Sequence, residues 1–249
     1  HKPWNKIKSA GEDMRNKIKV ALIIIFFLIL AAGGLVMASG LKEVKVKGNI
    51  YYADDKLKDE LKKYYVKGNT ILTYLRLKYD KSITIPFVDE IDVDLTGLHS
   101  IVIDTTEKEV VGCLPFMGEF ICFDKDGIMV GSIPKEKDNI PVVTGINYDT
   151  AVFNKPIAAK NAEVFELTLN ITQLIKKYGL EINRIEFEDN LSIKLYEKDV
   201  KILLGRRKHF DEQISNLVEI LPKTKGMKGT LHMEDFSETN KRVIFEADK

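Results

Sequence analysis

The chain of 249 residues carries 38 basic and 37 acidic side chains, so its formal net charge is only +1. This balance excludes the strongly basic surface that nucleic-acid-binding proteins use, and we expect no nucleic-acid partner. Two cysteines, Cys113 and Cys122, are too few for a fold built on a disulfide scaffold.

The longest apolar stretch runs from Val20 to Ala38 without a charged residue. As a helix at about 1.5 Å per residue it would span roughly 28 Å, close to the ~30 Å hydrocarbon core of a bilayer. A cleaved signal peptide has a shorter apolar region, of about 7 to 15 residues. We therefore predict an uncleaved transmembrane helix over residues 20–39.

Basic residues set the expected orientation of this helix. Three of them, Lys42, Lys45 and Lys47, follow it closely, whereas six precede it, and positive charge stays on the cytoplasmic side. Residues 1–19 are thus predicted to be a cytoplasmic tail, and the chain beyond residue 39 to lie outside the cytoplasm. Because the sequence begins with His1 rather than Met, we expect the natural tail to be longer.

Residues 42–108 follow the order β-α-α-β-β. Val44 and Val46 alternate with charged residues, as in a half-buried strand. Two amphipathic helices follow, the second capped by Asn69, and then two strands over 88–95 and 101–103. The helices should bury their apolar stripes against one sheet face. The expected stripes are Leu57, Leu61, Tyr64 and Tyr65 in the first helix and Ile71, Leu72, Leu75 and Tyr79 in the second.

Residues 109–229 consist of short strands joined by turn residues, which predicts a mixed, mostly antiparallel β-domain with two helices. Turns are expected at 115–118 and at 124–127, where Gly127 supplies a positive φ. Cys113 and Cys122 flank the first turn. An exported pair is able to oxidise, but we favour two small apolar residues in a sheet over a disulfide. Helices are expected over 162–178 and 210–221, and residues 230–249 form terminal strands and a tail. The predicted fold class is α+β.

No pattern in the chain indicates catalytic residues, a metal site or a cofactor. Asp124-x-Asp126-Gly127 resembles the middle of a calcium loop, but Cys122 stands where the first ligand belongs, so a hairpin turn is the better interpretation. Glu186 and Glu188 lie close enough in sequence to be considered as an acid-base pair. Because they alternate with apolar residues, we expect them on the solvated face of a strand.

Seven short sequence words follow the membrane segment in order. They are Val44-x-Val46-x-Gly48-Asn49, Gly68-Asn69-x-Ile71-Leu72, Ile85-Pro86-Phe87-Val88, Glu107-Lys108-x-Val110-Val111, Phe123-Asp124-x-Asp126-Gly127-Ile128, Pro141-Val142-Val143-Thr144-Gly145 and Val200-x-Ile202-x-Leu204-Gly205. An anchored β-α-α-β-β module resembles the POTRA domain, and the words resemble the bacterial cell-division family FtsQ/DivIB. Two positions depart from the family pattern: Val110 replaces a common Pro, and Leu231-His232-Met233 replaces Asp-Leu-Arg.

The resemblance implies a non-enzymatic, single-pass membrane protein of the division septum. Its external POTRA domain and β-domain would link early and late division proteins and control septal peptidoglycan synthesis through protein-protein contacts. The implied partners are FtsL-like and FtsB/DivIC-like coiled-coil membrane proteins and the septal peptidoglycan synthase complex. No small-molecule substrate is implied.

Two other classes of function are the alternatives. A membrane-anchored cell-envelope hydrolase would need a nucleophile-base or carboxylate pair, which we do not find in the exported part. A POTRA-containing assembly or secretion factor would need a transmembrane barrel, and the sequence after Lys108 is too short and too often interrupted by helices for one.

We place the partner-binding site on the two terminal strands, expected over 230–233 and 242–245. A final strand has only one obligatory neighbour in its own chain, so its free edge can accept a strand of a partner. The family resemblance points to the same end of the domain. The alternative is a tail that only closes the sheet and is disordered after Glu246. The expected contact residues are Thr230, Leu231, His232, Met233, Phe236, Val243, Ile244 and Phe245.

Overall fold

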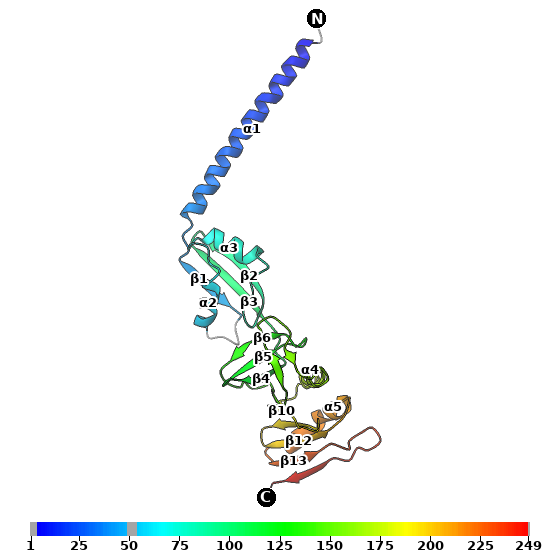
Figure 1. Ribbon diagram of the computed structural model, residues 1–249. Coiled ribbons are helices and arrows are strands. Elements are labelled where there is room, and N and C mark those ends of the chain that lie inside the picture. Colours follow the sequence, from blue (N-terminus) through cyan, green and yellow to red (C-terminus); the bar gives the residue numbers. More distant parts are fainter. Residues whose placement is uncertain (1–3, 49–53, 249) are drawn as a thin grey trace. The chain divides into compact units, whose positions relative to one another are not determined.

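The computed structural model describes residues 4–48 and 54–248. The chain divides into two compact units, residues 1–85 with 89–107 and residues 86–88 with 108–249 (Figure 1). Each unit contains helices packed on its own sheet, in agreement with the predicted α+β class. Residues 1–3 of the expected cytoplasmic tail, and Asn49 of the first sequence word, lie outside the described residues.

The first helix, α1, runs from Trp4–Ala38 and includes the predicted apolar stretch. Its part from Met14–Ala38 is long and apolar enough to cross a membrane, and it is the one such helix in the described part of the chain. The helix ends one residue earlier than predicted, because Ser39 turns out of it. The Ser39 hydroxyl donates a hydrogen bond to the Val36 carbonyl at 2.7 Å and so satisfies one of the last helical acceptors.

The first unit contains β1 (Glu43–Lys47), α2 (Asp54–Lys62), α3 (Thr70–Tyr79), β2 (Val88–Gly97) and β3 (Ser100–Glu107). This is the predicted β-α-α-β-β order. The sheet has the order β1-β3-β2, with β1 parallel to β3. The long connection that a parallel pair requires runs through both helices and β2. Ile101 and Ile103 of the central strand are fully buried, as are Leu57 and Leu61 of α2.

The prediction of which face of α3 points into the core is wrong. Asn69 caps the helix as expected, because its side-chain oxygen accepts a hydrogen bond from the Leu72 amide. However, the buried residues are Thr70, Thr73 and Leu77, which lie at helical spacing on the side opposite the predicted stripe. The α3 sequence has apolar residues on two faces, and packing on the sheet selected the face with the two threonines.

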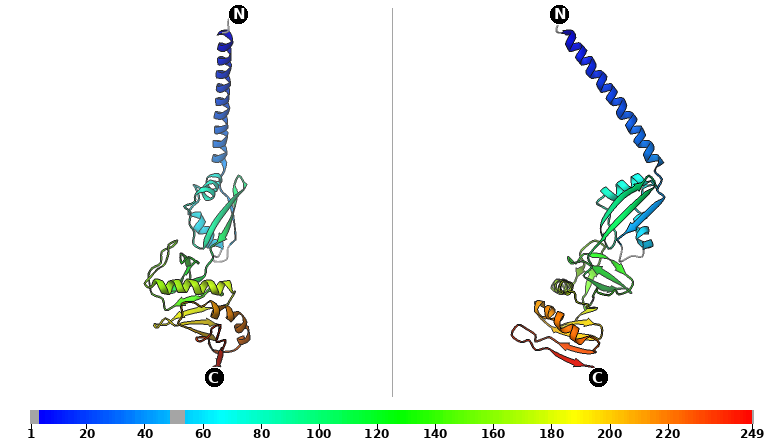
Figure 2. Two further views of the ribbon diagram at one scale, coloured as in Figure 1. Left: turned by 90° about the vertical axis from the view of Figure 1, so that its right-hand side faces the viewer. Right: turned by 180° about the vertical axis from the view of Figure 1, so that it is seen from behind.

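The second unit contains a nine-stranded sheet in the order β14-β13-β12-β11-β10-β7-β4-β5-β6 within the described residues. Its helices α4 (Ala162–Lys177) and α5 (Asp211–Ile220) cover the same face of the sheet (Figure 2). Buried residues of both helices join those of the strands in one apolar core. The strands are β4 (Gly112–Phe116), β5 (Glu119–Phe123), β6 (Met129–Ile133), β7 (Val142–Thr144), β10 (Arg184–Phe187), β11 (Ile193–Glu197), β12 (Val200–Gly205), β13 (Gly229–His232) and β14 (Ile244–Ala247).

Two predicted turns form hairpins in this sheet. Between β5 and β6, the Asp124 carboxylate accepts hydrogen bonds from the amides of Asp126 and Ile128, and Gly127 has a φ of +74°. The hairpin interpretation of this segment is therefore confirmed. Between β4 and β5, Met117 and Gly118 both have positive φ, as the commonest two-residue hairpin turn requires.

The prediction that the two cysteines remain separate is wrong, because Cys113 and Cys122 form a disulfide. The two-residue turn sets a register in which these residues stand directly opposite each other on β4 and β5. Both residues are buried, with 1 % and 0 % of their surface exposed. The turn was predicted correctly to lie within residues 115–118, but the pairing of Cys113 with Cys122 across the two strands was not predicted.

Other differences concern the connections. The short hairpin of β8 (Tyr148–Thr150) and β9 (Ala158–Ala159) was not predicted. After α5, the chain continues as a 3₁₀ turn, η1 (Leu221–Thr224), with Pro222 near its start, where a missing N–H costs no hydrogen bond. Residues 86–88 pack with the second unit rather than the first, and the Phe87 amide donates to the Val130 carbonyl at 2.8 Å.

Candidate partner-binding edge

The terminal strands continue the large sheet. β12 pairs with β13 in parallel, and β13 pairs with β14 in antiparallel, so among the described strands β14 has a neighbour on one side only. β14 begins two residues later than the predicted strand. Its register places Leu231 opposite Phe245 and His232 opposite Ile244.

The register also shows which backbone groups of β14 point outward. The Asp248 amide donates to the Lys228 carbonyl at 3.0 Å, so this opposite pair is hydrogen-bonded across the two strands. Hydrogen-bonded pairs alternate along an antiparallel ladder. Glu246 and Ile244 therefore also face β13, whereas the N–H and C=O groups of Phe245 and Ala247 point away from the sheet.

The opposite edge of the sheet is less open. β6 is its last strand, but the amides of Phe87 and Asn154 donate to the carbonyls of Val130 and Met129. The Met129 amide in turn donates to the Lys155 carbonyl. Loops thus use hydrogen-bonding groups of β6, as proteins commonly do to protect an edge strand. Between the two edges, β14 is the better acceptor for a further strand.

The structure separates the eight predicted contact residues into buried and accessible groups. Leu231, Met233 and Phe236 have 1 %, 0 % and 4 % of their surface exposed and belong to the apolar core. Their side chains anchor the terminal segment in the core and are not accessible to a partner. Thr230, His232, Val243 and Phe245 are half-buried, and Ile244 is 47 % exposed.

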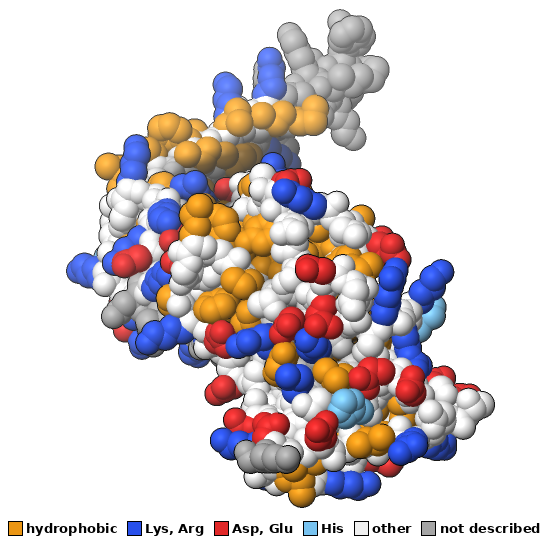
Figure 3. Space-filling view, turned by 60° about the horizontal axis from the view of Figure 1, so that its bottom comes forward, with side chains coloured by type: hydrophobic (Ala, Val, Ile, Leu, Met, Phe, Trp, Pro, Cys, Tyr) orange, Lys and Arg blue, Asp and Glu red, His pale blue; other side chains and the backbone are white. Residues whose placement is uncertain are grey.

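The accessible face of these strands is polar with one apolar residue. The His232 imidazole lies between two carboxylates, 3.3 Å from Glu234 and 3.6 Å from Glu246. Ile244 stands opposite His232 on the neighbouring strand. Figure 3 turns the bottom of Figure 1 toward the viewer and shows acidic and basic side chains interspersed with small apolar patches. Glu234 and Glu246 were not among the predicted contact residues.

Side chains from α5 and the preceding loop fix the position of β13. The amide nitrogen of Gln213, a fully buried residue of α5, donates to the carbonyls of Leu204 and Met233 at 2.9 and 2.6 Å. The Arg207 guanidinium donates to the Glu234 carbonyl at 2.6 Å. The ends of β12 and β13 are therefore tied together, and β14 is paired to a strand that is held in place.

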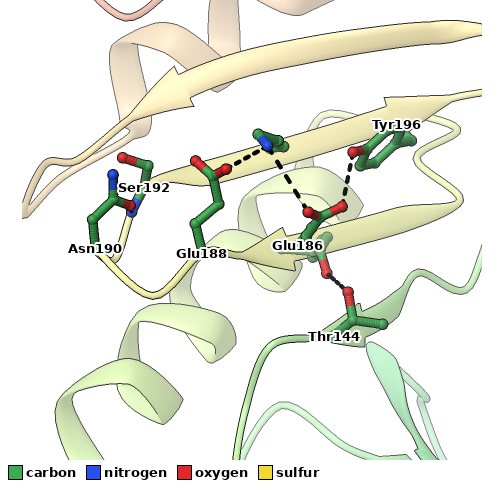
Figure 4. A network of polar contacts seen from close by, with 8 residues as sticks. Thr144, Glu186, Glu188, Asn190, Ser192 and Tyr196 are labelled. Carbon is green, nitrogen blue, oxygen red and sulfur yellow. Dashed lines mark hydrogen bonds and ion pairs between the residues drawn. The ribbon is translucent and has the colours of Figure 1, made fainter.

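The two glutamates considered as an acid-base pair lie on the sheet face, in a network of polar contacts (Figure 4). Glu186 accepts a hydrogen bond from the Tyr196 hydroxyl at 2.8 Å, and the Lys194 ammonium pairs with both Glu188 and Glu186. Burial, followed by the hydrogen bond to Glu186, raises the pKa of Tyr196 to about 12. The one ammonium group of Lys194 is shared between both carboxylates, and the network connects strands β10 and β11.

A surface recess of about 320 Å³ lies between the end of α4 and α5. Two carboxylates line it, Glu181 and Glu197, which the sequence did not single out. Glu181 pairs with Lys198 at 3.7 Å, and burial raises the pKa of Glu197. The residues lining the recess include no His, Ser or Cys, so it holds no Ser-His or Cys-His pair.

Among residues 14–48 and 56–248, whose side chains the structure describes, no three His, Cys, Asp or Glu side chains form a group that could hold a metal ion. Comparison with known proteins adds no family assignment: no protein-family model matches the chain, and no curated protein is similar to it in sequence.

Proposed function

We propose that the chain is a single-pass membrane protein of the bacterial division septum, of the FtsQ/DivIB kind. Its N-terminus lies in the cytoplasm, α1 spans the membrane, and the chain beyond residue 39 lies outside. It is a scaffold and regulator rather than an enzyme, linking early and late division proteins and controlling septal peptidoglycan synthesis.

The observation that carries the proposal is the order of the parts. A helix of membrane-spanning length is followed, after residues 39–42, by a β-α-α-β-β unit with a parallel β1–β3 pair, and then by a larger sheet that ends in an edge strand. The first unit corresponds to the POTRA domain in this proposal. The order matches the family that the seven sequence words resemble.

The disulfide supports an extracytoplasmic location for the second unit. Structural disulfides form and persist in oxidising compartments and are rare in the cytoplasm, where thiols are kept reduced. Cys113 and Cys122 are both buried in the sheet, so their bond is a structural disulfide that links β4 to β5. The basic residues before the apolar stretch favour the same orientation.

The partner site in this proposal is the free edge of β14. A partner strand would bond to the outward N–H and C=O groups of Phe245 and Ala247, and the exposed Ile244 would give an apolar contact on one face. FtsL-like and FtsB/DivIC-like coiled-coil proteins are the proposed partners, because an extended segment of either could add to the sheet. They would connect the chain to the septal peptidoglycan synthase complex.

A pair of substitutions at Ala247 tests this site. Ala247→Pro removes one outward N–H and fills its place with the proline ring, while the bonds between β13 and β14 remain. Ala247→Ser keeps the N–H and is the matched control. With the full chain as bait in its native host, we expect the wild type and Ala247→Ser to recover the coiled-coil division proteins, and Ala247→Pro to recover far less. Equal recovery by the two variants would reject the β14 edge as the site.

A further inference from the structure

The outer face of α3 carries a second apolar stripe that turns away from its own unit. Leu72, Leu75 and Tyr79 are 37 %, 43 % and 67 % exposed. At about 100° per residue they lie, with Arg76, on the side opposite the buried residues of the helix. A single exposed leucine is ordinary, whereas three large apolar side chains on one helix face indicate a surface that binds something.

Hydrogen bonds place the start of α3 at the end of α1. The Asn69 amide group donates to the Val36 carbonyl in the last turn of α1, and the Ser39 hydroxyl donates to the Asn69 side chain at 3.0 Å. The Thr70 amide donates to the Ser39 carbonyl at 2.7 Å. The first turn of α3 is therefore joined to the residues at which the chain leaves the apolar helix.

The turn between β2 and β3 is tied to the same place. The His99 ring nitrogen lies 2.8 Å from the Gly40 carbonyl, and the amides of Lys42 and Glu43 donate to the His99 carbonyl. Leu98 in this turn and Leu95 just before it are 41 % and 44 % exposed. Beyond α1, the large exposed apolar side chains of the described first unit are confined to α3 and this end of the hairpin.

The charges around α3 favour an anionic surface. Residues 62–81 contain six basic side chains and one acidic one, Asp80, which pairs with Arg76 at 3.9 Å. Lys78 pairs with Asp92 of the neighbouring strand β2 at 4.0 Å, and the other four are lysines. Lysine and arginine can lay their apolar stems along a membrane surface while their charged ends reach the phosphates. A helix with an apolar face and basic neighbours is the type that lies in the headgroup region of a bilayer.

We propose that α3 and the β2–β3 turn rest in the headgroup region of the bilayer that α1 spans. Leu72, Leu75 and Tyr79 enter the interface, and Arg76 lies at the level of the lipid phosphates. Because α1 tethers the unit to the membrane, even a weak affinity of the α3 face for lipid suffices to keep this face at the bilayer surface. This inference rests on the proposed anchoring by α1 and adds to it a defined membrane-facing side of the first unit.

Depth-dependent quenching of tryptophan fluorescence tests the inference on the full chain. The chain has one tryptophan, Trp4, which is replaced by Phe in all variants. Leu75→Trp places a probe on the outer face of α3. Glu90→Trp is the control on the same unit, because it lies seven residues before Gly97 on β2, roughly 23 Å along the strand. Each variant is placed, one chain per disc, in nanodiscs of phosphatidylcholine and phosphatidylglycerol with a quencher on the lipid headgroup.

We expect the fluorescence of Leu75→Trp to be blue-shifted and quenched roughly threefold or more above that of Glu90→Trp. One chain per disc excludes a second copy as the cause. Thermal unfolding that matches the parent protein establishes that each variant folds. Equal, weak quenching at both positions in a folded, inserted chain would overturn the inference. Extraction by alkaline carbonate from vesicles of the same lipids would instead reject the anchoring by α1, so the two failures are distinguishable.

Discussion

Asn69 has two structural tasks, because one side chain both caps α3 and joins it to the end of α1. Its oxygen accepts from the Leu72 amide and the Ser39 hydroxyl, and its nitrogen donates to the Val36 carbonyl. Replacing an N-cap asparagine by alanine costs about 1 kcal/mol, which corresponds to roughly fivefold faster exchange of the helix amides. We expect Asn69→Ala to produce this change in residues 70–79, measured by hydrogen exchange and mass spectrometry.

Asn69→Asp is the control that separates the two tasks. A carboxylate still caps the helix, and negative charge is favourable at a helix N-terminus, but the donor to Val36 is lost. We expect exchange within α3 to stay near the wild-type rate in this variant. Equal acceleration in the alanine and aspartate variants would show that the bond to Val36, rather than the cap, protects the helix.

Tyr196 should show a measurable dependence on pH. Its pKa is raised to about 12, first by burial and then by the hydrogen bond to Glu186. The unfolded chain has the ordinary tyrosine pKa of about 10, so the folded state binds this proton more tightly. The stability that Tyr196 contributes is therefore complete below pH 10 and is lost as the pH rises from 10 towards 12.

The absorbance of ionised tyrosine allows a direct check of this shift. The difference between the titrations of the wild type and Tyr196→Phe gives the curve of this residue alone. Glu186→Gln removes the negative charge that helps to hold the proton, so we expect it to move the Tyr196 curve to lower pH. A Tyr196 curve centred near pH 10 in the wild type would contradict the proposed environment of the hydroxyl.

Among the glycines of the second unit, Gly145 leaves the least room for a Cβ atom. It follows β7 with a φ of +81°, and a Cβ atom there would stand 1.9 Å from the Phe187 carbonyl oxygen of β10. Gly118 has a similar φ of +87° but has open space around it. Gly118→Ala should cost about 1–2 kcal/mol from the backbone conformation alone. We expect Gly145→Ala to lower the urea midpoint of the second unit clearly further, and equal losses would contradict the strand contact.

The disulfide between β4 and β5 closes a short loop and should stabilise the second unit modestly. For the observed separation of 9 residues, loop-closure entropy gives roughly 2–3 kcal/mol. We expect a reducing agent to lower the urea midpoint of the second unit by a corresponding amount. Thiol titration of protein unfolded without reductant should find no free thiols, and two free thiols would show that the cysteines remain separate.

The order of the elements could be predicted from local patterns, whereas their faces and registers could not. Asn69 and Asn161 cap the predicted helices, because a cap depends on neighbouring residues only. The inward face of α3 was predicted wrongly because apolar residues lie on both sides of it. β14 begins two residues later than predicted, since its register is set by pairing with β13 and not by its own sequence.

For the candidate site, the position of the strand could be predicted, but the accessibility of its side chains could not. The position of the last strand at a sheet edge follows from chain order, and the structure places β14 there. Which side chains remain accessible depends on packing against α5. Leu231, Met233 and Phe236 therefore lie in the core, although their sequence pattern suited a contact surface. Glu234 and Glu246 come close to His232 only through the pairing of the two strands.

For the whole molecule, we propose a membrane anchor, a membrane-facing side of the first unit and a partner-binding edge on the last strand of the second sheet. An anchor of this kind would confine the chain to one membrane, so that membrane-bound partners would need to meet it in two dimensions only. The outer face of α3 and the backbone of Phe245 and Ala247 involve different residues. Variants of the outer face of α3 should therefore leave the β14 edge unchanged, and variants of the β14 edge should leave α3 unchanged.

The central claim is that the chain is a division scaffold that acts through the β14 edge. It is tested most directly by measuring division in cells whose only copy of the protein is a variant. Depletion of the protein from its native host should give filaments that elongate without completing septa. We expect the wild type and Ala247→Ser to restore short, dividing cells, and Ala247→Pro, present at the same level in the membrane, to leave filaments. Normal division after depletion, or full rescue by Ala247→Pro, would contradict a division scaffold that acts through the β14 edge.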